Sequence, residues 1–65
     1  MKYSLKELRA RKGVSQEELA RLIGITARTV HNYESDIEKL RNTSYKNIEN
    51  LARALEVEIN EIFLG

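Results

Sequence analysis

Two short helical patterns joined by one tight turn fill the chain between Ser15 and Glu34. Ser15, followed three residues later by Glu18, has the capping-box spacing that begins a helix. Gly24 is placed to end that helix, because glycine adopts the left-handed backbone of a helix stop without steric cost. Thr26 is placed to cap a second helix only two residues later. A connection this short forces the two helices to cross steeply, which predicts a rigid two-helix unit.

Apolar spacing predicts which faces of the two helices point inward. The inward face of the first helix is expected to consist of Leu19, Ala20, Leu22 and Ile23. Val14, just before the cap, is placed to pack against Leu19 as a hydrophobic staple. In the second helix, Val30 and Tyr33 lie three residues apart and are expected to face the core.

The outer face of the second helix carries side chains that suit recognition of DNA bases. Arg28 offers a fork of donors that fits guanine, and Asn32 can bond bidentately to adenine. Ala27 can contact a thymine methyl group, and His31 projects from the same side. The alternative is an ordinary solvated face of a short helix, which is the commoner reason for such a mixture of polar residues.

Composition narrows the class of protein. A chain of 65 residues predicts a single small domain covering residues 1–65, near the lower limit for a core without cross-links. There is no cysteine, so disulfides and thiolate metal sites are excluded, and a cytoplasmic location is the simplest expectation. No signal peptide or membrane-spanning run is recognisable. Apolar spacings of three and four recur throughout and predict an all-α fold.

Charge is unevenly distributed along the chain. The formal net charge is only +1, but residues 1–46 carry ten Lys and Arg against six Asp and Glu, whereas residues 47–65 carry one Arg against four Glu. The basic part contains the two-helix unit. This asymmetry weakly supports a face that meets phosphates.

Further helices are expected on both sides of the two-helix unit. Ser4 and Gly13 are placed to begin and end a helix over Ser4–Lys12. Its basic end favours either compensation of the helix dipole or contact with a phosphate; the cations there are Arg9, Arg11 and Lys12. Another helix is capped by Ser44 and has a core stripe made of Tyr45, Ile48, Leu51, Ala52 and Leu55. A last helix is expected over Ile59–Leu64, with Glu58 as a poor cap.

The segment Ser35–Thr43 admits two interpretations. Val30, Tyr33, Ile37 and Leu40 share one helical stripe, which predicts that the outward-reading helix continues as far as Leu40. Alternatively, that helix stops near Glu34 and two apolar residues anchor an irregular loop.

These residues resemble the helix-turn-helix domains of the phage lambda-repressor and Cro type, also called the xenobiotic-response-element family. The resemblance lies in LKELRARKGVSQEELARLIGITARTVHNYE and in SYKNIENLARALEVEINEIF, so that it covers nearly the whole chain. It implies a compact five-helix bundle whose third helix lies in the major groove of DNA.

The resemblance also implies roles for individual residues. Gln16 matches a phosphate contact that can also brace the reading helix, and Arg9 with Glu34 matches an ion pair between two helices. The base-edge positions are matched by Ala27, Arg28 and Asn32. Phosphate or peripheral positions are matched by Thr26, Thr29 and His31, and positions in the following loop by Lys39 and Arg41.

One departure from the family pattern lies in that loop. Asp36 stands where a glycine is common, and the connection to the next helix is about four residues longer, which corresponds to one helical turn. Asp36 and Glu38 would repel a phosphate that lay beside them, which argues against phosphate contacts by Lys39 and Arg41.

The function expected from these observations is sequence-specific binding of double-stranded DNA by a transcriptional regulator that acts as a repressor. A homodimer is expected on DNA. The small size of the chain and its apolar end, Ile62, Phe63 and Leu64, suggest a surface through which two copies associate. The alternative is a protein-interaction module, such as an antitoxin-like partner. An enzyme is not expected, because a single histidine and no cysteine offer no recognisable catalytic constellation, and no cofactor or metal is implied.

Overall fold

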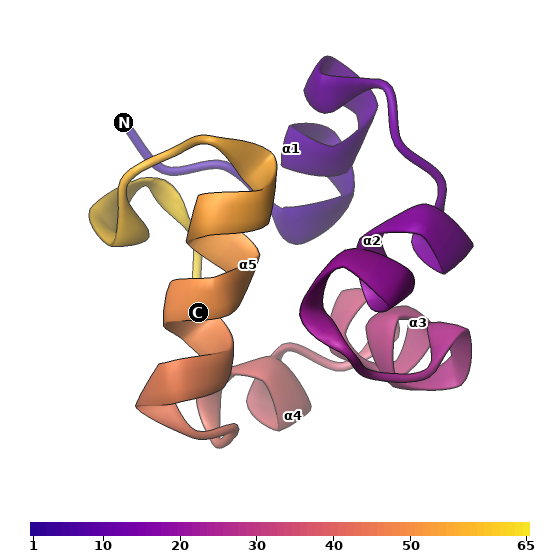
Figure 1. Ribbon diagram of the computed structural model, residues 1–65. Helices are drawn as coiled ribbons and strands as arrows, with labels where there is room; N and C mark the ends of the chain where they lie inside the picture. Colours follow the sequence, from indigo (N-terminus) through magenta and orange to yellow (C-terminus); the bar gives the residue numbers. More distant parts are fainter.

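The computed structural model describes residues 1–65 as five α-helices followed by one 3-10 turn (Figure 1). The elements are α1 (Leu5–Lys12), α2 (Gln16–Ile23), α3 (Ala27–Ser35), α4 (Ile37–Arg41), α5 (Tyr45–Leu55) and η1 (Ile59–Glu61). The all-α, five-helix class predicted from the sequence is confirmed. Two of the boundaries expected within it are not.

Hydroxyl side chains begin four of the helices where the sequence predicts them. Each hydroxyl accepts a hydrogen bond of 3.0 to 3.2 Å from the backbone N–H three residues later; these caps are Ser4, Ser15, Thr26 and Ser44. Gly13 and Gly24 end α1 and α2 with φ of 78° and 77°. A residue with a Cβ would be strained there, so these two glycines fix the turns on either side of α2.

The core is entirely apolar and draws on every helix. Its buried residues are Leu5, Leu8, Leu19, Ala20, Val30, Tyr33, Leu40, Ile48, Leu51, Ala52, Leu55 and Ile62. Val30 is completely buried and Tyr33 nearly so, which confirms the inward face predicted for α3. The polar face of α3 is therefore the one left for a partner.

Two residues predicted to be in the core are exposed instead. Leu22 is 60 % exposed, because successive residues turn by about 100° and Leu22 falls well outside the arc that Leu19, Ala20 and Ile23 share. Tyr45 is 67 % exposed. It is the first residue of α5, and helical side chains tilt toward the N-terminus, so its ring extends beyond the end of the bundle.

The predicted continuation of the helix to Leu40 is wrong; the alternative is confirmed in that α3 stops near Glu34, at Ser35, but wrong in placing an irregular loop after it. At Asp36 the backbone is extended, with φ −140° and ψ 100°, so α3 stops there and a separate helix α4 begins. The Asp36 carboxylate caps α4 by accepting a 3.1 Å hydrogen bond from the Glu38 N–H. Leu40 is completely buried and Ile37 packs against the core. The apolar residues Ile37 and Leu40 therefore do contact the core, but they do so from the separate helix α4 and not from a continuation of α3.

The helix predicted over Ile59–Leu64 is also not confirmed beyond its first turn, because only the 3-10 turn η1 forms there, over Ile59–Glu61. After η1 the chain runs extended beside Tyr3: the Tyr3 N–H donates to the Glu61 carbonyl, and the Phe63 N–H donates to the Tyr3 carbonyl, both at 2.8 Å. Ile62 is thereby completely buried. Pairing with the N-terminal segment satisfies backbone groups that a longer helix would have satisfied internally.

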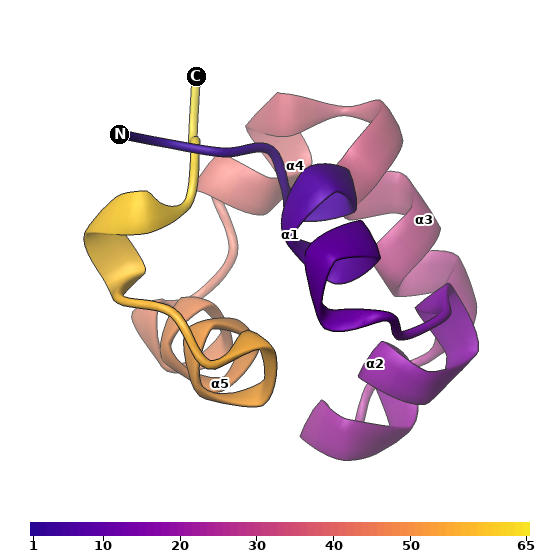
Figure 2. The same cartoon turned by 90° about the horizontal axis from the view of Figure 1, so that it is seen from above.

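The helices divide the molecule into two sides. Figures 1 and 2 both place α2 and α3 on one side of the bundle and α5 with η1 on the other. The two chain ends lie close together in Figure 2, as the pairing of Tyr3 with Ile62 requires. None of the helices has the length and apolarity to cross a membrane.

Replacing Leu40 tests whether α4 belongs to the core. Leu40→Ala removes a completely buried side chain and is expected to lower the free energy of unfolding by about 2–5 kcal/mol. Lys39→Ala, at the exposed neighbouring position, is the control and is expected to change it by less than about 0.5 kcal/mol. Urea unfolding followed by circular dichroism measures both. Equal effects would show that α4 is a surface appendage.

Candidate nucleic-acid interface

The residues predicted to read bases, Ala27, Arg28 and Asn32, form one ridge on α3 together with His31. Arg28 and His31 are exposed, and Ala27 and Asn32 are half-buried beside them. Arg28 takes part in none of the ion pairs of the protein, and the Asn32 side-chain amide makes no hydrogen bond within it. The structure therefore brings these four residues together and leaves the side-chain donors of Arg28, His31 and Asn32 free.

Thr26 and Thr29 lie at the N-terminal end of that ridge. Their hydroxyl oxygens are 2.8 Å apart, and the Thr26 hydroxyl accepts a 3.1 Å bond from the Thr29 N–H. Each hydroxyl can still bond one more group, since it has one donor and two acceptor positions. The pair therefore caps α3 while remaining able to contact a phosphate.

A carboxylate at the end of α3 ties three helices together. Glu34 Oε2 accepts a 2.8 Å bond from Arg9 Nε on α1, and Oε1 accepts bonds from Arg9 Nη2 at 3.3 Å and Gln16 Nε2 at 3.0 Å. The Glu34 side chain is only 6 % exposed. This network confirms the predicted Arg9–Glu34 pair and shows the bracing contact of Gln16 with the reading helix.

Arg9 is the hub of this network. Besides its two bonds to Glu34, it donates from Nη1 to the Val14 carbonyl at 3.0 Å, which fixes the loop between α1 and α2. The hydrogen bond to Glu34 raises the pKa of Arg9, and the charge of Glu34 adds to this, while partial burial opposes both. The guanidinium thus stays charged wherever the protein is folded.

A polar hollow of about 340 Å³ opens between these helices. No hydrophobic residue lines it; its residues are Lys6, Arg9, Gln16, His31, Glu34 and Ser35. His31 and Ser35 follow Arg28 along the same side of α3, at spacings of three and four residues. The hollow therefore continues the ridge of α3 toward α1.

The sequence reasoning did not single out Lys6 or Ser35. Lys6 stands one helical turn before Arg9, and Ser35 one turn after His31, so both spacings were available in the sequence. The sequence does not predict that α1 lies close to the end of α3, because the tertiary hydrogen bonds of Glu34 set the distance between these two elements.

The basic end of α1 proves to be engaged within the protein. Arg11 pairs with Glu7 at 3.6 Å and lies 4.0 Å above the Tyr3 ring, and Lys12 pairs with Glu56. Glu56 ends α5 in a left-handed conformation with φ 59°. Of the two roles open for this cluster, these contacts support a structural one.

Lys39 and Arg41 lie on α4, apart from the ridge. Both are exposed, and Arg41 makes a 3.4 Å contact with Glu38 at 47 % and 71 % side-chain exposure. The break at Asp36 separates them from α3, and neither lines the polar hollow. The structure does not assemble them with the other predicted residues.

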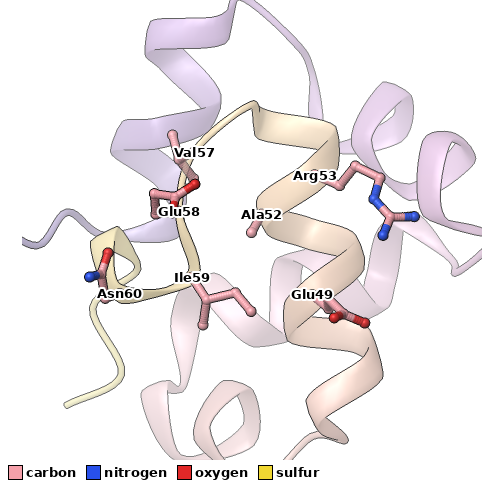
Figure 3. A pocket seen from close by; sticks show the side chains of 7 residues that line it. All are labelled: Glu49, Ala52, Arg53, Val57, Glu58, Ile59 and Asn60. Atoms are coloured by element: carbon pink, nitrogen blue, oxygen red, sulfur yellow. The ribbon is translucent and has the colours of Figure 1, made fainter.

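A second depression, of about 490 Å³, lies on the other side of the bundle between α5 and η1. Figure 3 shows Glu58 and Asn60 on one side of this groove and Glu49 with Arg53 on the other. Its floor includes Ala52 and the side chains of Val57 and Ile59. The groove shares no residue with the ridge of α3.

Comparison with known proteins agrees with this geometry. The model of the family described as helix-turn-helix matches residues 5–62, and the chain belongs to that family. A solved structure, the restriction-modification controller protein C.AhdI from Aeromonas hydrophila, superposes with a TM-score of 0.76 and is 46 % identical. The match covers 91 % of this chain and 81 % of that one. No curated protein matches the chain.

Family membership and the shared fold identify the protein as a DNA-binding transcriptional regulator. They confirm the lambda-repressor and Cro-type resemblance and do not favour the protein-interaction module. The two-helix unit of Ser15–Glu34 is the helix-turn-helix itself, formed by α2 and α3.

Glu34→Gln tests the network that holds α1, α2 and α3 together. The change keeps the shape of the side chain but leaves the mostly buried Arg9 without its counter-charge, at an expected cost of about 1.5–3 kcal/mol in the free energy of unfolding. Glu38→Gln breaks the exposed pair with Arg41 and should cost almost nothing. Thermal and urea unfolding compare the two. Equal losses would mean that burial does not strengthen the Arg9–Glu34 pair.

Proposed function

We propose that the protein reads a specific operator in the major groove with α3. Arg28 and Asn32 supply hydrogen bonds to base edges, and Ala27 supplies apolar contact with a thymine methyl group. The observation that carries this proposal is the pair of free donors, Arg28 and Asn32, on the exposed ridge of a helix whose other face is buried. Polar groups with no partner in the protein suit a partner that arrives in the groove.

Backbone contacts flank the base readers in this proposal. Thr26 and Thr29 act at the start of α3, and Gln16 and His31 act near its end. Lys39 and Arg41 contribute at the periphery through α4. Such contacts fix the register of the protein on the duplex without reading sequence.

Regulation by occupying the operator fits a helix bundle of this kind. The name of the similar structure, a restriction-modification controller, supports a role in controlling genes. We propose repression by steric blocking of the promoter, and the family membership supports a binding protein rather than an enzyme.

Selection of bound sequences from a random duplex pool tests the operator proposal. The expected result is one enriched motif whose half-sites repeat at about one helical turn, or 34 Å. Binding that stays equal for all sequences at every salt concentration would reject sequence-specific function. A reporter placed behind the selected site then measures the direction of regulation, and repression is the expected outcome.

Substitution of Arg28 distinguishes base reading from charge. Arg28→Ala is expected to cost about 1–3 kcal/mol in binding to the selected site and to relax preference at one base pair. Arg28→Lys, the matched control, keeps the charge but loses the bidentate fork, so it should relax the same preference. Affinity is measured against each single-base variant of the site. Uniform weakening over all sequences in Arg28→Ala, with affinity kept in Arg28→Lys, would show that Arg28 contacts a phosphate.

Two copies are proposed to associate through the side of the bundle that carries α5 and η1. In the apolar end that first suggested a dimer, Ile62 is unavailable because it is completely buried, whereas Phe63 is 44 % exposed. Arg53 and Glu58 carry opposite charges on the two sides of the groove in Figure 3, and neither takes part in an ion pair within the chain. A two-fold axis along the groove would bring Arg53 of each copy to Glu58 of the other.

The size of the bundle fits this arrangement. It measures 25 × 22 × 20 Å, and α3 lies on the side away from the groove. Two copies joined at the groove can therefore place their α3 helices about 34 Å apart, as two successive turns of the major groove require.

Charge reversal tests the proposed dimer. Arg53→Glu is expected to weaken association at least tenfold, because it opposes two like charges across the axis, and Arg53→Glu with Glu58→Arg should restore it. Sedimentation equilibrium measures association. A wild-type protein that is monomeric both free and on a two-half-site duplex would remove the dimer from the proposal.

A further inference from the structure

Three polar side chains connect the reading helix to α5. The hydroxyl of Tyr33 on α3 lies 2.9 Å from the hydroxyl of Thr43, which stands in the connection between α4 and α5. The side-chain amide of Asn47, in the first turn of α5, donates to the Thr43 hydroxyl at 3.0 Å and more weakly to the Tyr33 hydroxyl at 3.5 Å. Tyr33 is only 8 % exposed, and the other two residues are half-buried. These three side chains form the Tyr33 cluster, which is partly shielded from water.

Backbone packing alone does not hold α3 to α5. The reading helix packs closely against α2 and α4, and α5 packs against α2, but α3 and α5 have no comparably extended contact with each other. Figures 1 and 2 show the two helices on different sides of the bundle, joined in sequence only through the short helix α4. The Tyr33 cluster is therefore the polar link between the reading helix and α5.

The hydroxyl of Tyr33 is not needed to fill the core. A phenylalanine ring would occupy the same volume, whereas the hydroxyl adds bonds whose direction depends on where α5 lies. Apolar packing tolerates small rotations of one element on another, but a satisfied hydrogen-bond network specifies one arrangement. Glu34, the next residue, already binds α3 to α1 and α2. The two neighbouring residues thus hold α3 from two directions.

The angle between α3 and α5 matters most in a dimer. In the arrangement proposed above, α5 lies near the two-fold axis and α3 contacts DNA, so a change of this angle is repeated in the second copy and alters the separation of the two reading helices. We propose that Tyr33, Thr43 and Asn47 are positioning residues that set the half-site spacing which the dimer accepts. This inference rests on the proposed reading of DNA by α3 and on the proposed association through α5 and η1.

Duplexes with varied half-site spacing test this proposal. One added base pair moves the half-sites apart by about 3.4 Å and rotates one of them by roughly 35° about the duplex axis. The wild type should therefore bind its preferred spacing about tenfold more tightly than a duplex with one base pair added or removed, because misplacement costs a bidentate base contact. In Tyr33→Phe, which keeps the ring but loses the bonds of the hydroxyl, this ratio should fall to about threefold or less. Fluorescence anisotropy measures the affinities.

Matched variants identify the cause of the effect. Thr43→Val removes the hydroxyl at the centre of the cluster and should lower the ratio as Tyr33→Phe does. The double variant should lose little more than Thr43→Val alone, because the two changes remove a shared bond. Thr43→Ser keeps the hydroxyl and should keep the wild-type ratio. Tyr45→Phe makes the same chemical change at a tyrosine that is 67 % exposed, and it should keep the ratio too.

The ratio between spacings separates positioning from stability. A loss of stability alone lowers the folded fraction and weakens binding to every duplex by the same factor, so it leaves the ratio unchanged. Circular dichroism shows whether each variant is folded. A wild-type ratio in folded Tyr33→Phe would overturn the proposal. A changed base preference on a single half-site would overturn it too, because the effect would then lie within the reading helix.

The behaviour of the wild type separates this inference from the proposed function. If the wild type binds no selected site, the proposed function itself fails. If it binds a selected site but shows no preference for spacing, the proposed dimer fails, and the inference fails with it in both cases. If the wild type has a sharp spacing preference that Tyr33→Phe and Thr43→Val both retain, the inference alone fails.

Discussion

The position of the reading helix depends on one mostly buried carboxylate. Glu34 binds Arg9 of α1 and Gln16 of α2, and Arg9 also holds the loop carbonyl of Val14. A carboxylate in this environment is stable only with its partners in place, so the three helices must come together in one arrangement. The polar hollow follows from that arrangement, since α1, α2 and α3 all contribute residues to its lining.

The apolar core sets which face of α3 remains available. Val30 and Tyr33 anchor α3, and Leu40 on α4 extends the same cluster after the chain turns at Asp36. The break at Asp36 matters for function, because it limits the reading helix to one that ends at Ser35. A continuous helix through Leu40 would have placed Lys39 and Arg41 further along the axis of α3. The separate α4 keeps them apart from the ridge.

The two sides of the bundle have different chemistry. The side with α2 and α3 presents free donors, among them Arg28, Asn32 and Lys6, whereas the groove between α5 and η1 combines an apolar floor with charges of both signs. A polar, donor-rich surface suits a phosphate backbone and base edges. A surface that combines apolar residues with charges of both signs is typical of contacts between proteins. The fold thus places the donor-rich surface and the mixed groove on opposite sides of the bundle.

The sequence by itself determined the helix starts, the two glycine stops and the polar face of α3, because caps, turns and periodicity act within a few residues. It also contained the pairing of Arg9 with Glu34, but only through the resemblance. Tertiary structure decided the rest. The burial of Ile62 beside Tyr3 and the meeting of Lys6 with His31 depend on contacts between distant segments, and no local signal encodes those distances.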